Sequence, residues 1–150
     1  MSDLKKELHQ LCIDYVRGRM DTATQAINTA QQAANEETKS SAGDKYETGR
    51  AMAQQETDRN QAQLNEANKL MVALNHINVG VVSKTALPGS LVITNNGKFY
   101  IAISAGALIL NGDAYFAISP ASPIGLILSG RKAGDEFSLN GKQYRVENII

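Results

Sequence analysis

The stretch Ala42-Gly43-Asp44-Lys45-Tyr46-Glu47 separates two long segments that favour helix, and it decides how the first half of the chain is arranged. Small and acidic residues at such a position favour a turn and a new helix start. No proline occurs before Pro88, so nothing in either segment breaks a helix. We therefore predict an outgoing helix, a turn at this stretch and a returning helix, which together form an antiparallel α-helical coiled-coil hairpin.

The turn carries two carboxylates three residues apart, Asp44 and Glu47. This spacing is that of a capping box, in which Asp44 would cap the returning helix. A pair one helical turn apart can also hold a hard divalent cation such as Mg²⁺ through its oxygens. Two carboxylates bind Mg²⁺ weakly, so this second interpretation requires further ligands from a partner. Both interpretations remain open at this point.

The outgoing helix is expected from about residue 3 to about residue 35, a length of roughly 50 Å at ~1.5 Å per residue. Its first part has a face of Leu4, Leu8, Leu11 and Tyr15 with helical spacing. Beyond Gly18 this face continues mainly with alanines, which bury little area and stabilise little. Such a helix suits an arm better than a globular core.

The returning helix is expected from about residue 46 to about residue 76. Apolar positions recur every seven residues, at Ala53, Ala67 and Leu74, and Asn60 interrupts them. The hairpin is thus apolar at its base and polar toward its tip, which suits insertion into a wet cavity of a partner. A self-associating arm, such as a four-helix dimer, is the alternative. The weak seam near the tip argues against it, so we expect a monomer.

The second half, residues 78–150, has the composition of a compact β-rich domain. It contains all three prolines and six of the eight aromatic residues. Ser122 and Pro123 have the character of an N-cap and a first helical residue, and Gly130 that of a helix stop. We predict an α+β protein: a hairpin arm at 1–77, and at 78–150 a small antiparallel sheet with one short helix, Ile124 to Leu128. The expected strands cover 78–84, 91–94, 98–103, 107–110, 115–119, 136–139 and 143–149.

Composition and charge argue against several classes of function. Residues 1–78 carry nine basic and eleven acidic side chains, and residues 79–150 carry six and four, so no strong field favours nucleic acid or an anionic membrane. A single cysteine excludes an internal disulfide and fits a reducing compartment. The start lacks an apolar signal segment, and no apolar run approaches the roughly 18 residues of a membrane span. A cytoplasmic protein is expected.

The sequence offers no catalytic constellation of its own. Residues 125–132 are superficially similar to a phosphate-binding loop, but they lack its lysine-hydroxyl ending, and Leu126 to Leu128 are expected in the core. His9 and His76 have no ligand-spaced neighbours and are expected at the surface or at a hinge. Cys12 is expected to be a small buried hydrophobe. We therefore predict that the protein is not an enzyme and binds no cofactor alone.

Three stretches taken together resemble the Gre family of bacterial transcript-cleavage factors. The start, Leu4-Lys5-Lys6-Glu7-Leu8-His9-Gln10-Leu11, is similar to the opening of the first helix in that family. Gly43-Asp44-Lys45-Tyr46-Glu47 matches its Gly-Asp-x-x-Glu tip. The strongest match is Ile118 to Gly125, running on to the segment from Gly130 to Glu136, which resembles the Ser-Pro-…-Gly-Lys-x-x-Gly-Asp segment of the carboxy-terminal domain.

The resemblance implies an FKBP-like second domain and a specific partner, RNA polymerase. In the Gre family the coiled coil enters the secondary channel of the polymerase, and the second domain docks at the channel rim. The tip carboxylates complete a second Mg²⁺ site, and the polymerase then cleaves backtracked RNA. Asp44 and Glu47 match that pair, and Mg²⁺ would be shared with the polymerase. The residues implied in partner binding are Ser122, Pro123, Ile124, Arg131 and Lys132.

The tip departs from the family pattern after the second carboxylate. Gre tips typically continue Glu-Asn-Ala-Glu-Tyr after the aspartate, whereas here Glu47 is followed by Thr48-Gly49-Arg50-Ala51, and Tyr46 precedes it. A Gre-like paralogue that occupies the channel without stimulating cleavage is therefore one alternative. A self-associating interaction module is another. A peptidyl-prolyl isomerase, suggested by fold analogy alone, has the least support because Phe99, Tyr100, Phe116 and Tyr144 are expected to be taken up by the core.

Overall fold

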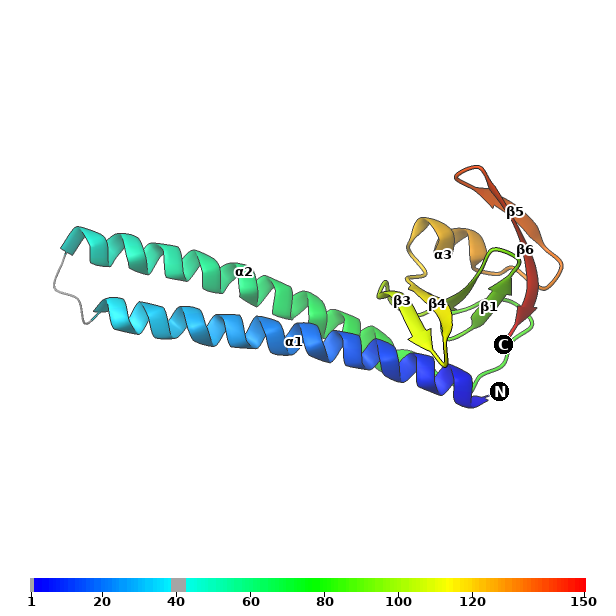
Figure 1. The fold of residues 1–150 in the computed structure, drawn as a ribbon, viewed down its shortest axis with the longest axis horizontal. Helices are drawn as coiled ribbons and strands as arrows, with labels where there is room; N and C mark the ends of the chain where they lie inside the picture. Colours follow the sequence, from blue (N-terminus) through cyan, green and yellow to red (C-terminus); the bar gives the residue numbers. More distant parts are fainter. Residues whose placement is uncertain (1, 39–42) are drawn as a thin grey trace. The chain divides into compact units, whose positions relative to one another are not determined.

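A computed structural model describes the backbone of residues 2–38 and 43–150 (Figure 1). Side chains are described from residue 3 onward, except at positions 34, 36–38 and 43–50. Of the turn predicted at 42–47, Ala42 lies outside the described residues, as do the side chains of Asp44 and Glu47, whereas the backbone of residues 43–47 is helical and not a turn. The chain forms two compact units, one of residues 16–71 and one of residues 1–15 together with 72–150.

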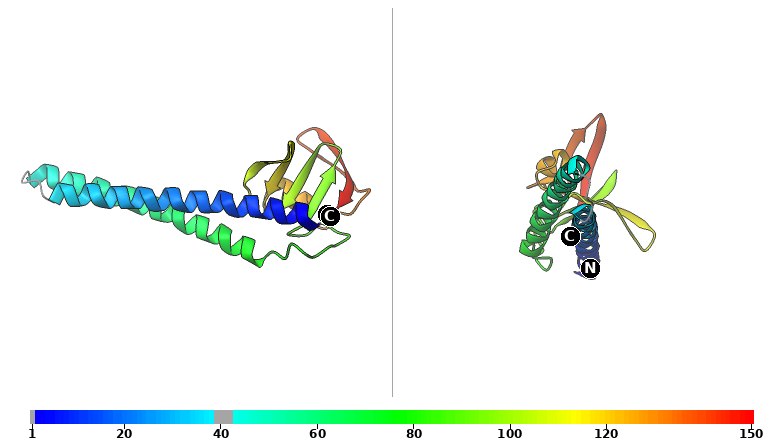
Figure 2. Two further views of the ribbon diagram at one scale, coloured as in Figure 1. Left: turned by 60° about the horizontal axis from the view of Figure 1, so that its bottom comes forward. Right: turned by 90° about the vertical axis from the view of Figure 1, so that its left-hand side faces the viewer.

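Two long helices account for the first half of the chain, as predicted. They are α1 (Ser2–Thr38) and α2 (Gly43–His76). Within residues 16–71 they lie side by side in every view (Figure 2). The buried side chains here recur every seven residues: Val16, Ala23 and Ala30 on α1, and Asn60 and Ala67 on α2. None of the described helices combines the length and apolar character needed to cross a membrane.

The seam between these helices is made of small residues and one amide. Alanines allow two helix backbones to approach closely but remove little apolar area from water. Asn60 is buried, and its Nδ2 has no hydrogen-bond partner in the described part of the chain. A buried polar residue at such a position favours one pairing register at a cost in stability.

The second half forms a six-stranded mixed sheet with one short helix, which makes the chain an α+β protein. The elements are β1 (Leu91–Thr94), β2 (Gly97–Ile101), β3 (Gly106–Leu110), β4 (Asp113–Ile118), α3 (Pro123–Leu128), β5 (Glu136–Leu139) and β6 (Lys142–Ile149). Their order across the sheet is β3-β4-β2-β1-β6-β5. All six strands and the helix were predicted, with ends that differ by up to two residues.

The prediction of an antiparallel sheet is wrong at one pair, because β2 and β4 are parallel. After β2 the chain crosses one strand position and forms β3 at the edge of the sheet. β4 then returns antiparallel to β3 and fills the vacant position beside β2. Strands β2 and β4 both run opposite to β3, so they run in the same direction as each other. Sequence patterns identify strands but not this crossover.

Two tight turns set the registers of the outer hairpins. Asn111 and Gly112 join β3 to β4 with φ values of 52° and 82°. Asn140 and Gly141 join β5 to β6 with φ values of 53° and 82°. Positive φ at both central residues is the type I′ geometry, which matches the twist of the flanking strands and favours asparagine and glycine. Both dipeptides are recognisable as turn signals in the sequence itself.

Within the unit of residues 1–15 and 72–150, a helix covers part of each face of the sheet. One face carries Val92, Phe99, Ile101 and Val146, against which α3 packs with Leu128 and the partly buried Ile124 and Ile127. Consecutive strand residues point to opposite faces, so Tyr100 points to the other side. There its hydroxyl contacts His9 of α1. The start of α1 therefore forms the second covering layer.

The predicted strand at 78–84 is wrong. The Oδ1 of Asn78 accepts a hydrogen bond from the N–H of Gly80 at 3.0 Å, which turns the chain away from an extended path. Val81 and Val82 are exposed, and the carbonyl of Val81 accepts a hydrogen bond from the Nζ of Lys5 at 2.9 Å. The valines suggested a strand, but none of the strands that the structure describes pairs with this segment. The adjoining Thr85 forms an isolated bridge with Lys132.

Candidate functional site

The two tip carboxylates lie in the first turn of α2, because this helix begins at Gly43. Asp44 and Glu47 are three positions apart within the helix, and residues with this spacing share a face. An N-cap residue lies outside the helix, so this start does not suit Asp44 as the cap. The positive end of the helix dipole favours carboxylates in the first turn.

The segment that resembles the Gre carboxy-terminal domain forms a tightly built loop and the start of α3. The Oγ of Ser122 accepts a hydrogen bond from the N–H of Gly125 at 3.1 Å and donates one to the carbonyl of Ser119 at 2.6 Å. Pro123 follows in the first turn of α3. These positions confirm the predicted N-cap and first helical residue. The hydroxyl of Ser122 is thus used within the loop.

Gly125 holds this loop against α3. A Cβ atom at this position would collide with the carbonyl oxygen of Ser119 and would lie 2.9 Å from the Oγ of Ser122. The helix ends at Leu128 with Ser129 as its C-cap, and Gly130 follows with a φ of 82°, in agreement with the helix stop expected there. The conformation of the loop that contains Pro120 and Pro123 therefore requires a glycine at the buried position 125.

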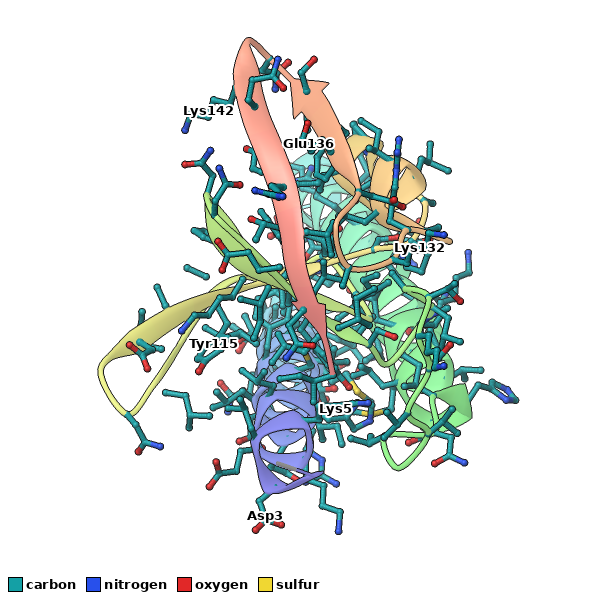
Figure 3. All side chains as sticks on the ribbon, turned by 90° about the vertical axis from the view of Figure 1, so that its right-hand side faces the viewer. Asp3, Lys5, Tyr115, Lys132, Glu136 and Lys142 are labelled. Carbon is teal, nitrogen blue, oxygen red and sulfur yellow. The ribbon has the colours of Figure 1, made fainter. Side chains whose placement is uncertain are left out.

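The two basic residues after α3 have different environments. The Nε of Arg131 donates to the carbonyl of Ile127 at 3.0 Å, and its guanidinium lies 5.7 Å from the ring centre of Phe137. The N–H of Lys132 donates to a side-chain oxygen of Asp135 at 3.0 Å and closes a turn at 132–135, while the side chain of Lys132 is exposed. Arg131 is therefore held in place, and Lys132 is directed to solvent (Figure 3).

Lys132 borders a groove of about 520 Å³ at the surface of the sheet domain. A second lysine, Lys84, comes from the segment that precedes β1. Neither ammonium group is paired with a carboxylate among the residues that the structure describes. The groove therefore offers two positive charges beside apolar walls, an arrangement suited to an acidic partner surface. Its lining consists of Val82, Ser83, Lys84, Lys132, Ala133, Asn148 and Ile149.

The apolar residues around α3 are not all in the core. Ile124, expected to contact a partner, packs against the core cluster. Leu126, expected in the core, is 67% exposed, while Leu128 is fully buried. Helical spacing explains this difference, since positions 124 and 128 share a face that position 126 does not. Leu126 is thus a candidate contact residue that the sequence interpretation missed.

A buried polar cluster joins α1, α2 and the sheet, and the sequence interpretation missed this as well. The Nδ1 of His9 lies 2.9 Å from the hydroxyl of Tyr100, with the two rings perpendicular. Burial lowers the pKa of His9, and a hydrogen bond with the backbone of Leu74 opposes this effect. Both histidines were expected at the surface or at a hinge; His9 is half-buried against the sheet, whereas His76 is exposed. The helical face of Leu4, Leu8 and Leu11 could have placed His9 beside the domain.

Cys12, beside this cluster, is buried as predicted, and burial raises the pKa of its thiol to about 12. Burial and the nearby Cys12 also raise the pKa of Tyr100. Both groups are therefore neutral at physiological pH, and neither has the character of a nucleophile.

No group of three or more metal-ligating side chains is present among the described residues. Two described features could contact a partner: the groove with its two lysines and the exposed Leu126. The chain matches no protein-family model, and no curated protein matches it.

Proposed function

We propose that this protein is a Gre-like factor that binds the secondary channel of bacterial RNA polymerase and stimulates cleavage of backtracked RNA. The polymerase supplies the catalytic site, and this chain supplies Asp44 and Glu47 as ligands of a shared second Mg²⁺. In two-metal catalysis the second ion stabilises the attacking or leaving oxygen, so completing its coordination accelerates hydrolysis. The protein is then an accessory factor and not an enzyme.

The observation that carries this proposal is the start of α2 at Gly43. It sets the matching carboxylates one turn apart at the beginning of a 34-residue helix, about 50 Å long at ~1.5 Å per residue. Two carboxylates alone hold Mg²⁺ weakly, so such a pair needs a partner. The pair becomes useful only where another molecule provides the remaining ligands.

The helix pair has the surface expected of an inserted arm. Its seam between residues 16 and 71 contains alanines and Asn60, and its outer positions are rich in exposed Gln, Asn and Thr. We infer that it is a coiled-coil hairpin, on the basis of the seven-residue spacing of its buried positions. A polar exterior of this kind gains little from further self-packing and suits a hydrated channel.

The sheet domain supports the docking part of the proposal. We infer that its mixed sheet, with α3 packed on one face, corresponds to the FKBP-like domain of the Gre family. Lys84 and Lys132 at the groove and the exposed Leu126 then form the surface that contacts the channel rim. Charged rim contacts of this type mainly raise the association rate, and their effect weakens with salt.

A paralogue that binds without stimulating cleavage is the second candidate, because Gly49 follows the carboxylate pair in the first turns of α2. Glycine loosens a helix by about 1 kcal/mol relative to alanine, which would let the pair deviate from the geometry that an Mg²⁺ ion requires. The two candidate functions share the binding site on the polymerase. They differ only in whether this chain completes the coordination of the Mg²⁺ ion.

Binding to RNA polymerase from the same organism tests both candidates. The proposal predicts a complex that a known Gre factor displaces by competition for the channel. Lys132→Ala should weaken binding about three- to tenfold at low salt, whereas Lys142→Ala, which removes an exposed lysine at the start of β6, should leave binding unchanged. A lack of complex formation, or binding that a Gre factor does not displace, would reject the channel proposal.

A further inference from the structure

Strand β3 is the outer strand at one edge of the sheet, and the backbone groups of two of its five residues point away from β4. Leu110 and Asp113 flank the two-residue turn and exchange hydrogen bonds, so the pairs Leu108–Tyr115 and Gly106–Ala117 do the same. The N–H and C=O groups of the intervening residues, Ala107 and Ile109, consequently point away from β4. They have no hydrogen-bond partner among the described residues.

This edge lacks the features that usually prevent strand pairing. Its sequence, Gly106-Ala107-Leu108-Ile109-Leu110, contains no charge and no proline. The opposite edge, β5, is only four residues long and begins with Glu136, whose carboxylate lies 3.9 Å from the guanidinium of Arg145. Short length and charged side chains are the common protection of edge strands. The two hairpins lie on opposite sides of the sheet (Figure 3), and only one of them is protected.

The exposed face of β3 is apolar as well. Ile109 is 64% exposed and Phe116 on β4 is 41% exposed, and both lie on the sheet face that carries Phe99. The ring centres of Phe99 and Phe116 are 5.9 Å apart. The apolar face thus continues from the core to the edge, where nothing among the described residues covers it.

We propose that β3 is a dimerisation edge, at which the β3 strands of two copies pair antiparallel and join the two sheets. An axis through Leu108 pairs all five residues of each strand, and it sets the free groups of Ala107 against those of Ile109 in the second copy. On the apolar face each isoleucine then lies opposite an alanine, so large and small side chains alternate. Because β3 has no charged residue, no like charges face each other in this pairing.

The occupant is a second copy because β3 offers nothing by which to select a charged or polar segment. An uncharged, apolar, extended strand of the same length is its complement, and β3 is itself such a strand. The sequence led us to expect a monomer, with a four-helix dimer as the alternative. The dimer proposed here forms through the sheet and not through the helices. Five residue pairs form a small interface, for which a dissociation constant on the order of 10–100 µM is expected.

The test is sedimentation equilibrium of the full chain from about 5 µM to about 1 mM, a range that brackets the expected dissociation constant. The wild type should reach twice the 16.2 kDa mass of one chain. Ile109→Lys should raise the dissociation constant at least about tenfold, since the like charges occur in both copies. Leu126→Lys is the matched control, because Leu126 is an equally exposed apolar residue on α3, and it should dimerise as the wild type does.

Hydrogen exchange locates the interface independently. The amides of Ala107 and Ile109 should exchange more slowly at about 1 mM than at about 5 µM, and those of β5 should not change. A monomeric wild type over the whole range would overturn the proposal. Equal weakening by Ile109→Lys and Leu126→Lys would also overturn it, as would an Ile109→Lys dimer of wild-type affinity whose thermal unfolding matches that of the wild type.

Discussion

The imidazole Nδ1 of His9 and the hydroxyl of Tyr100 lie 2.9 Å apart, and this contact joins the first helix to the second strand of the sheet. The two residues are 91 positions apart in the sequence. Tyr100 is fully buried, so its hydroxyl would lose a hydrogen bond if the imidazole were removed. The same imidazole interacts with the backbone of Leu74, so one side chain connects α1, α2 and β2.

Stability should depend on the protonation of His9. Its pKa is lowered from 6.5 in the folded protein, chiefly by burial, so the unfolded chain binds a proton first as the pH falls. The free energy of unfolding is therefore highest above pH 6.5 and decreases as the pH falls toward the lowered pKa. Urea unfolding between pH 5 and pH 8 measures this slope.

The variant His9→Phe is the control for this pH dependence of the free energy of unfolding. The variant lacks the titrating group, so its free energy of unfolding should vary less between pH 5 and pH 7 than that of the wild type. It should also be less stable at pH 8, because the hydroxyl of Tyr100 is left without the imidazole. Identical slopes in the two proteins would contradict the assignment.

Asn60→Ala should stabilise the helix pair. The substitution removes a buried amide whose Nδ2 has no partner among the described residues, and alanine matches the small residues of the seam. We expect a gain of about 1 kcal/mol. Asn68→Ala, on the exposed side of the same helix, is the control and should gain only about 0.5 kcal/mol from helix propensity. Thermal unfolding followed by circular dichroism measures both, and a destabilised Asn60→Ala would mean that the amide is satisfied.

Gly125→Ala should destabilise the sheet domain by about 2–4 kcal/mol, because the new methyl group collides with the Ser119 carbonyl. Gly18→Ala is the opposite case: its added methyl group meets nothing within 4 Å, and helix propensity predicts a gain of about 0.5–1 kcal/mol. Urea unfolding of the two variants distinguishes a glycine that the loop requires from one that merely weakens a helix. Equal effects would contradict this distinction.

Local signals in the sequence predicted most of the elements. The Asn-Gly turns at 111–112 and 140–141 and the Ser122–Pro123 helix start depend on backbone preferences of single residues, and such preferences are visible without a structure. The valines at 79–82 carried the same type of signal for a strand. There the side chain of Asn78 bonds to the backbone of Gly80 and turns the chain instead.

Long-range relationships could not be predicted in the same way. The parallel pair β2–β4 depends on where β3 lies, which no strand pattern encodes. The contact of His9 with Tyr100 requires the start of α1 to cover the sheet, and a histidine between leucines does not identify its partner. Among the candidate site residues, the cap at Ser122 was predictable, whereas the exposure of Leu126 and the groove between Lys84 and Lys132 followed only from tertiary packing.

The most direct test of the proposed function is RNA cleavage by stalled, backtracked polymerase from the same organism. The assay compares the wild type with the Asp44→Ala/Glu47→Ala double variant, each at a concentration that saturates polymerase binding. The proposal predicts shortened RNA with the wild type and none above background with the double variant, while both bind equally. Cleavage that persists with the double variant, or wild-type protein that binds the polymerase and leaves the RNA intact, would contradict the claim that these two carboxylates complete the catalytic Mg²⁺ site.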